Sequence, residues 1–289
     1  MNYRHAFHAG NFADVVKHAL FCRLVRYLQR KEGAIRIYDT HAGPGLYDLS
    51  GDAAARTMEY ASGVAALAAC DAAIRDHPLL ADYWAIVAPE LAADRYPGSP
   101  LIARRLMRPQ DRLSAYELHP RDGESLKQLF AGDPAVKAIA LDGWLALGAH
   151  LPPKEKRGLV LIDPPFEKTS EVADIVAALQ KGLARWRGGT YAVWYPIKRR
   201  TMVEQLREEL AAIAQGEIVF TEFLREPMTS DEIFVGTGLA VINPPYVFAE
   251  EAEVLLSLLL PVFGRGNTAT MTIKASQAQP SGQTQSIDR

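Results

Sequence analysis

The spacing of hydrophobic residues changes several times along the chain, and each spacing predicts a type of secondary structure. Between residues 11 and 30 apolar residues recur at intervals of three or four, which predicts an amphipathic helix with Arg23, Arg26 and Arg30 on its polar positions. Short runs rich in Val, Ile, Leu and Tyr that end in an acid, Gly or Pro predict strands. The predicted strands are residues 35–45, 111–120, 135–144, 158–166, 189–197, 217–226 and 238–248.

Helical spacing fills most of the gaps between these strands. The predicted helices are residues 122–131, 143–151, 169–185 and 201–215. This alternation predicts an α/β fold with a seven-stranded, mostly parallel sheet covered on both faces. The last two strands are too close in sequence for a helical crossover, so we expect them to form an antiparallel hairpin at the sheet edge.

Composition divides the chain into three parts. Residues 50–96 are rich in Ala and Leu without a strand pattern, which predicts an inserted helical subdomain. The main domain is then residues 1–49 and 97–265, of which 1–34 form an N-terminal motif and helix. Residues 266–289 are largely polar, and we expect a disordered tail.

Charge and composition narrow the classes of function. The chain has 289 residues and a net charge of −2. This net charge argues against a protein that binds nucleic acid through its overall charge. Residues 1–36 nevertheless carry seven Lys and Arg against two acids, and smaller basic clusters lie at 104–108 and 198–200. These clusters are either solvated helix faces or parts of an RNA-binding face.

Targeting signals and cysteine chemistry add little to this picture. No long apolar run or signal peptide is visible. Cys22 and Cys70 lack metal-ligand spacing, which predicts small buried hydrophobes in a reducing compartment. We therefore expect a cytoplasmic protein without a metal ion or a membrane association. We also expect a monomer, although the sequence does not fix the oligomeric state.

Acidic residues end four successive predicted strands. They are Asp39, Glu117, Asp142 and Asp163. The carboxyl ends of parallel strands share one edge of a sheet, where ligands of open α/β folds bind. One acid at a strand end is ordinary, but four in succession indicate a shared ligand with several hydrogen-bond donors.

The loop after the first strand helps to choose that ligand. A nicotinamide dinucleotide would require a third glycine at position 48, where this chain has an aspartate that would repel a pyrophosphate. S-adenosylmethionine has no phosphate, and its ribose hydroxyls and adenine amine would suit Glu117 and Asp142. The ordered acids therefore favour S-adenosylmethionine.

The segment "LVLIDPPFEK" at 159–168 has the chemistry needed to hold an exocyclic amine of a base. Asp163 can accept one N–H, the rigid Pro164 carbonyl can accept the other, and Phe166 can stack on the base. The segment "NPPY" at 243–246 has the same pattern. We rank "NPPY" lower because an antiparallel strand would place its end at the opposite sheet edge.

Several motifs together resemble a known family. They are "YRHAFHAGNFADVVKH", "DTHAGPG", "YPGSP", "ELHP", "LDGW" and "LIDPPF", in order from residue 3 onward. This set is similar to the bacterial enzymes that N6-methylate an adenine of 23S ribosomal RNA. The chain departs from the family pattern at Phe166, where Tyr is common, and at His41, where many methyltransferases have Phe.

The resemblance implies a Rossmann-like class I methyltransferase fold with a small helical insertion. It implies a cofactor site for S-adenosylmethionine made by His18, His41, Ser99, Glu117, Asp142, Gly143 and Asp163. It also implies that Tyr3, with His5 and Lys17 nearby, faces the RNA.

Three other functions remain open at this stage. DNA adenine-N6 and ribosomal RNA guanine-N2 methyltransferases hold an amine with the same motif. A non-catalytic RNA-binding protein could also have kept the fold.

Overall fold

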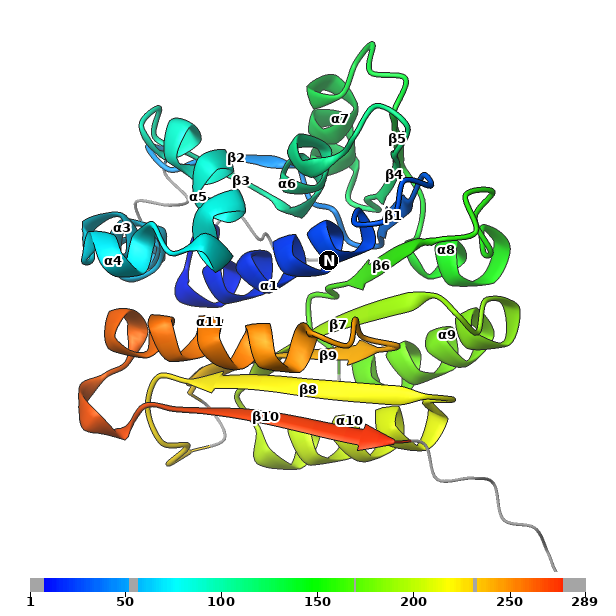
Figure 1. Cartoon of the computed structure of the whole chain (residues 1–289). Coiled ribbons are helices and arrows are strands. Elements are labelled where there is room, and N and C mark those ends of the chain that lie inside the picture. Colours follow the sequence, from blue (N-terminus) through cyan, green and yellow to red (C-terminus); the bar gives the residue numbers. More distant parts are fainter. Residues whose placement is uncertain (1–7, 52–56, 169, 231–232, 278–289) are drawn as a thin grey trace, which may run out of the picture.

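The computed structural model describes residues 8–51, 57–168, 170–230 and 233–277, and its centre is an eight-stranded sheet (Figure 1). The strand order is β10-β8-β9-β7-β6-β1-β4-β5. These strands are β1 (Arg36–Asp39), β4 (Arg112–Tyr116), β5 (Val136–Ile139), β6 (Gly158–Ile162), β7 (Thr190–Ile197), β8 (Glu217–Leu224), β9 (Gly236–Ile242) and β10 (Thr270–Gln277). A separate two-stranded sheet pairs β2 (Leu46–Asp48) with β3 (Arg95–Pro97).

Five neighbouring strands run parallel and bring their carboxyl ends to one edge. Strand β1 pairs in parallel with β4 and β6, β4 with β5, and β6 with β7. Strand β9 runs antiparallel to both β7 and β8. The predicted mostly parallel, Rossmann-like α/β fold is therefore confirmed.

Strand β10 corrects two expectations. The sheet has eight strands rather than seven, and the β8–β9 hairpin is not its edge because β10 pairs antiparallel with β8 along eight residues. Residues 270–277, expected in a disordered tail, form this strand. Met271 and Ile273 pack against the core. The backbone N–H and C=O groups of this otherwise largely polar segment are paired with those of β8, and this pairing explains how it forms a strand.

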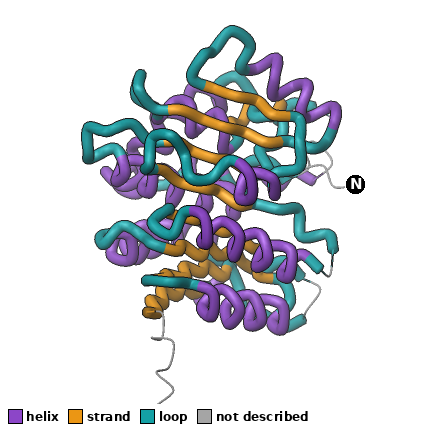
Figure 2. The backbone as a smooth tube through the Cα atoms, turned by 90° about the vertical axis from the view of Figure 1, so that its right-hand side faces the viewer, coloured by secondary structure: helices purple, strands orange, loops and turns teal. Residues whose placement is uncertain are grey.

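Helices cover both faces of the sheet (Figures 1 and 2). They are α1 (Phe12–Leu28), α3 (Val64–Ala69), α4 (Ala72–Arg75), α5 (Pro78–Leu91), α6 (Ser99–Leu106), α7 (Pro120–Leu129), α8 (Trp144–Ala149), α9 (Glu171–Arg185), α10 (Arg200–Ile213) and α11 (Phe248–Phe263). Strand β6 shows how the two cores form. Leu159 and Leu161 face the core of α1, α6 and α11, whereas Val160 and Ile162 face the core of α8, α9 and α10.

Helix α1 is mostly buried rather than amphipathic, because it packs against the sheet, α5, α6 and α11. Its basic residues are neutralised by neighbouring helices. Arg23 is 2.8 Å from Glu251 of α11, and Arg26 is 2.8 Å from Asp82 of α5. The basic excess predicted to form an RNA-binding arm is therefore largely used in packing within the described residues.

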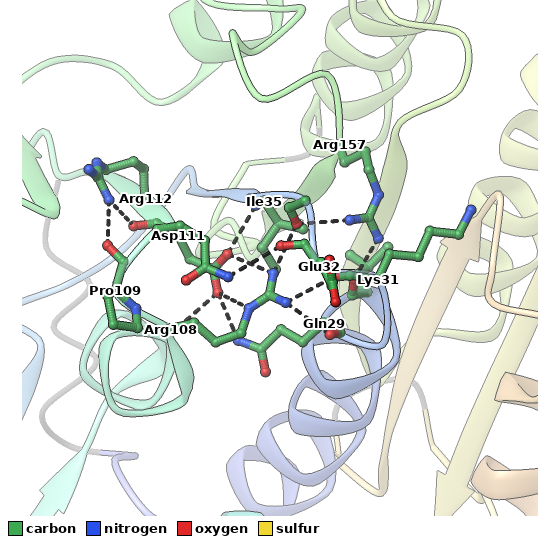
Figure 3. Close-up of polar contacts among 12 residues, drawn as sticks. Gln29, Lys31, Glu32, Ile35, Arg108, Pro109, Asp111, Arg112 and Arg157 are labelled. Carbon is green, nitrogen blue, oxygen red and sulfur yellow. Dashed lines mark hydrogen bonds and ion pairs between the residues drawn. The ribbon is translucent and has the colours of Figure 1, made fainter.

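A polar cluster holds the end of α1 against the start of β1, at the amino ends of β1 and β4 (Figure 3). The buried Asp111 carboxylate accepts hydrogen bonds from Gln29, the Ile35 backbone N–H and Arg108. The Arg108 guanidinium also donates to the carbonyls of Gln29 and Lys31. Arg108 therefore caps the end of α1, which leaves this part of the 104–108 cluster structural.

The region predicted as an inserted helical subdomain contains α3, α4, α5 and a 3₁₀ turn (Glu59–Ser62). Strand β3 then returns the chain to β2, beside the first βα loop. The helical content agrees with the expectation, while the division into domains stays a prediction. Among the described residues no helix combines the length and hydrophobicity needed to cross a membrane.

Candidate active site

A cavity of about 360 Å³ lies at the carboxyl edge of β1, β4, β5 and β6. Helix α1 and the loop before α6 complete its walls. The predicted residues that line this cavity are Lys17, His18, His41, Ser99, Glu117, Asp142, Gly143, Asp163 and Pro164. The fold therefore brings together all seven residues implied for the cofactor, from segments up to 145 positions apart (163 − 18).

Glu117 is held by backbone groups on two sides. One carboxylate oxygen accepts the Gly43 N–H at 2.8 Å, and the other accepts the His119 N–H at 2.7 Å. Gly43 adopts φ +61°, and a Cβ there would lie 2.4 Å from the Tyr47 hydroxyl. Burial raises the pKa of Glu117, although the two N–H groups oppose this shift. The loop therefore orients a fixed carboxylate toward the cavity.

The loop between β5 and α8 crosses over the end of β4 and lies directly against the end of β1. A Cβ on Gly143 would be only 1.8 Å from the Thr40 carbonyl oxygen, so only glycine allows this approach. Asp142 accepts the Trp144 N–H at 3.0 Å, and the Trp144 ring meets His41 edge-on at 4.9 Å. Burial lowers the pKa of His41 to about 4, so the imidazole is neutral at neutral pH.

His18 is positioned by a residue of the "YPGSP" segment. Its Nδ1 lies 2.8 Å from the Tyr96 hydroxyl, and the two rings stack with centroids 5.7 Å apart. Tyr96 is fully buried and also bonds to Tyr83 at 3.2 Å. Residues before and after the helical insertion are thus connected beneath the cavity.

Lys17 lies between two carboxylates inside the site. Its ammonium is 2.8 Å from Asp14 and 2.6 Å from Asp163, and only 2% of the side chain is exposed. Burial alone would lower the pKa of Lys17, but the two carboxylates more than offset it and the pKa is raised. Lys17 lines the main cavity, with its ammonium paired to acids rather than free, and its predicted position facing the RNA stays a prediction.

The three residues predicted to hold a base do not share one cavity. Asp163 and Pro164 line the main cavity, whereas Phe166 lines a neighbouring cavity of about 200 Å³. Lys168 and Glu171 border both cavities. Phe166 has φ +50°, a conformation that is costly for a bulky side chain and that is tolerated where the surrounding structure imposes it.

Trp194 is a residue of this site that the sequence did not single out. Its ring meets Phe166 edge-on at 5.8 Å, and Lys17 Nζ lies 5.5 Å from its centroid. Val193 pairs with Ile162, so Trp194 is level with Asp163 on the next strand. The strand register, had it been known, would have located this ring.

Asp39, one of the four acids expected to share a ligand, does not line the cavity. It is 1% exposed, and neither carboxylate oxygen has a hydrogen bond of good geometry within the described residues. Burial raises the pKa of Asp39 to about 7, with the nearby Ser99 hydroxyl acting in the opposite direction. A protonated or cation-paired carboxyl is therefore the favourable state at this strand end.

The competing "NPPY" motif lies away from the cavity. Asn243 donates hydrogen bonds of 2.8 Å to the carbonyls of Arg187 and Gly189, which precede β7. It ends the antiparallel strand β9 and so lies at the opposite sheet edge, as predicted. The predicted RNA-facing residues Tyr3 and His5 fall outside the described residues.

Comparison with known proteins places the chain in a family. The family model described as "Ribosomal RNA large subunit methyltransferase D, RlmJ" matches residues 32–273. Ribosomal RNA large subunit methyltransferase J of Escherichia coli is 36% identical over 263 residues, covering 90% of this chain and 92% of that protein. The Haemophilus influenzae protein of the same name is 34% identical over 278 residues, covering 95% and 98%.

A solved structure agrees with this result. The crystal structure of a Legionella pneumophila protein superposes with a TM-score of 0.83 at 34% identity, covering 92% of this chain and 98% of that one. Sequence and structure therefore agree over nearly the whole chain, and the protein belongs to the RlmJ family of ribosomal RNA large subunit methyltransferases.

Proposed function

We infer that this protein transfers a methyl group from S-adenosylmethionine to N6 of an adenine in 23S ribosomal RNA. Membership of the RlmJ family supports the reaction class and the substrate. The observation that carries the inference at the site is the position of Asp163 and Pro164 at the wall of the strand-edge cavity.

The donor set of the cavity suits S-adenosylmethionine. Glu117 and Asp142 stand at the ends of adjacent strands, where carboxylates can accept bonds from ribose hydroxyls and from the adenine amine. The Asp39 carboxyl is buried at the end of β1 and does not line the cavity, so we assign it no contact with the cofactor. When bound, the cofactor supplies an electrophilic methyl group on a sulfonium.

The protein's own residues would hold the target base. An extruded adenine is a poor nucleophile at N6, so its orientation contributes much of the rate. Lys17 holds Asp163 through the oxygen Oδ2, which leaves Oδ1 to accept one N6–H. The Pro164 carbonyl accepts the second hydrogen, and Phe166 with Trp194 forms an aromatic wall beside it.

The bonding change itself is simple. Bound S-adenosylmethionine would give up its sulfonium methyl to N6 and leave as the neutral thioether, and Oδ1 of Asp163 would accept the proton that N6 sheds. No covalent enzyme intermediate is required. The ion pair with Lys17 fixes the position of the Asp163 carboxylate, whose other oxygen accepts the N6–H.

Substrate choice is tested with labelled S-adenosylmethionine. The unmodified 23S RNA and duplex DNA are offered separately, and modified nucleosides are identified by mass spectrometry. We expect N6-methyladenosine in the RNA only. Label in guanine, or in DNA alone, would replace the proposal with one of the two alternative methyltransferase functions.

Asp163→Asn tests the amine-holding role. This change keeps the shape of the side chain but presents the base with a weaker or misoriented acceptor, and we expect methyl transfer to fall at least about 100-fold. Asn243→Ala is the matched control at the equivalent motif, and its turnover per folded molecule should stay near wild type. Activity of Asp163→Asn above about a tenth of wild type, with folding verified by circular dichroism, would contradict the assignment.

A further inference from the structure

The smaller cavity has a basic border that the proposed mechanism does not use. It is lined by the Phe166 ring and by the end of β7 and the start of α10, including Lys198, Arg199 and Met202. Because Lys168 and Glu171 border this cavity and the main one, the two cavities adjoin beside the Asp163–Phe166 turn.

Lys198 and Arg199 differ from the other basic clusters of the chain. The arginines of the 104–108 cluster are paired, Arg104 with Asp133, Arg105 with Glu90 and Arg108 with Asp111. Lys198 and Arg199 are exposed, and the described residues offer neither side chain an ion pair or a hydrogen bond. Their charges are therefore available to a ligand from solution.

The surrounding charges favour an anion at this place. Arg199 precedes α10, and the first turn of that helix has neither an acidic residue nor a side-chain cap. The N-terminal end of the α10 dipole adds to the positive potential of the two side chains. Glu171 is the acidic residue of the cavity wall, but it is buried and one of its oxygens accepts the Lys168 N–H at 3.2 Å.

We propose that Lys198 and Arg199 bind a backbone phosphate of the RNA strand next to the adenine that enters the site. This proposal rests on the proposed function. It adds a phosphate of the RNA backbone as a part of the substrate that the protein binds. An aromatic ring beside two unpaired cations matches a nucleotide, with its flat base and its charged phosphate. Because the net charge of the chain is −2, such a local contact would contribute much of its affinity for RNA.

The double variant Lys198→Gln/Arg199→Gln tests the proposal. Binding of a 23S RNA transcript is measured by filter retention at several salt concentrations, and turnover is measured at saturating cofactor. We expect KM for the RNA to rise roughly tenfold and the log–log salt slope of binding to shrink by about one to two units. The kcat and the affinity for S-adenosylmethionine should change little, because neither residue lines the main cavity.

Two controls separate a phosphate contact from a general loss of charge. Lys154→Gln/Lys181→Gln removes two exposed charges elsewhere and should leave the RNA affinity and the salt slope unchanged. Lys198→Arg/Arg199→Lys keeps the charge and should restore most of the affinity. An unchanged RNA affinity and salt slope in the Gln/Gln variant would overturn the proposal, even if the wild type methylates 23S RNA. If RNA binding weakens but N6-methyladenosine never forms, the proposed function fails and the phosphate contact stands.

Discussion

At the scale of single residues, the site depends on buried charges whose partners lie far away in the chain. Lys17 meets Asp163 across 146 positions, and Asp39 has no hydrogen-bonding partner of good geometry in the described structure. The sequence alone shows only that Lys17 and Asp39 are charged, and it does not show which residues surround them. Their energetics give two predictions.

Removing the Lys17 ammonium should destabilise the protein strongly. Lys17→Met leaves the buried Asp14 and the partly buried Asp163 without a compensating charge, and we expect a loss of about 3–5 kcal/mol in the free energy of unfolding. Urea titration measures this loss. Lys181→Met, on the exposed side of α9, is the control and should cost less than about 0.5 kcal/mol. Equal stability of the two variants would show that the Lys17 pairs contribute little.

Asp39 should make stability depend on pH. The pKa of this carboxyl is 3.8 in an open environment and about 7 in the fold. Between these values the folded state retains a proton that the unfolded chain has lost, so the free energy of unfolding falls as pH rises. Asp39→Asn cannot titrate, so the variant lacks this pH-dependent fall in the free energy of unfolding. The melting temperature of the variant, relative to wild type, should therefore rise from pH 4 to pH 7 and level off above pH 7.

The control for Asp39 is Glu204→Gln, which removes an exposed carboxylate from α10. It should show no comparable rise across the same pH range. A difference between Asp39→Asn and wild type that is constant with pH would mean that Asp39 is already ionised and compensated in the fold.

At the scale of elements, the strand ends are held together by close backbone contact. The βα units followed from hydrophobic spacing: the helices predicted at 122–131 and 201–215 correspond to α7 and α10. Helix α11, β10 and the small β2–β3 sheet were not predicted. Strands β2 and β3 have only three residues each, too few to show a period, and their pairing joins segments on either side of the helical insertion.

Gly143→Ala tests the contact between the end of β1 and the loop that follows β5. The added Cβ would meet the Thr40 carbonyl oxygen at 1.8 Å, and the backbone must shift to relieve the clash. We expect a loss of about 1–3 kcal/mol in stability and a clear loss of affinity for S-adenosylmethionine, measured by calorimetry. Gly148→Ala, in the adjacent helix α8, has no neighbour within 4 Å of the new Cβ and should be neutral or slightly stabilising. Unchanged cofactor affinity in Gly143→Ala would contradict the close packing.

At the scale of the whole molecule, β10 closes the sheet opposite β5. Its pairing with β8 and the packing of Met271 and Ile273 extend the core beyond the hairpin. A chain ending at residue 269 would expose the β8 backbone as an open edge. We expect a lower melting temperature and aggregation by light scattering, whereas a chain ending at 277 keeps every described strand. Equal melting temperatures for the two chains would show that β10 adds no stability.

The sequence by itself determined the α/β class, the order of most elements and the acids that meet at one sheet edge. Hydrophobic periodicity is local, and parallel strands necessarily bring their carboxyl ends together. Only the tertiary structure decided that Lys17 pairs with Asp163, that Trp194 stands beside Phe166, and that the N-terminal arginines pair with α5 and α11. Those contacts depend on strand register and helix packing between distant segments, which no local spacing encodes.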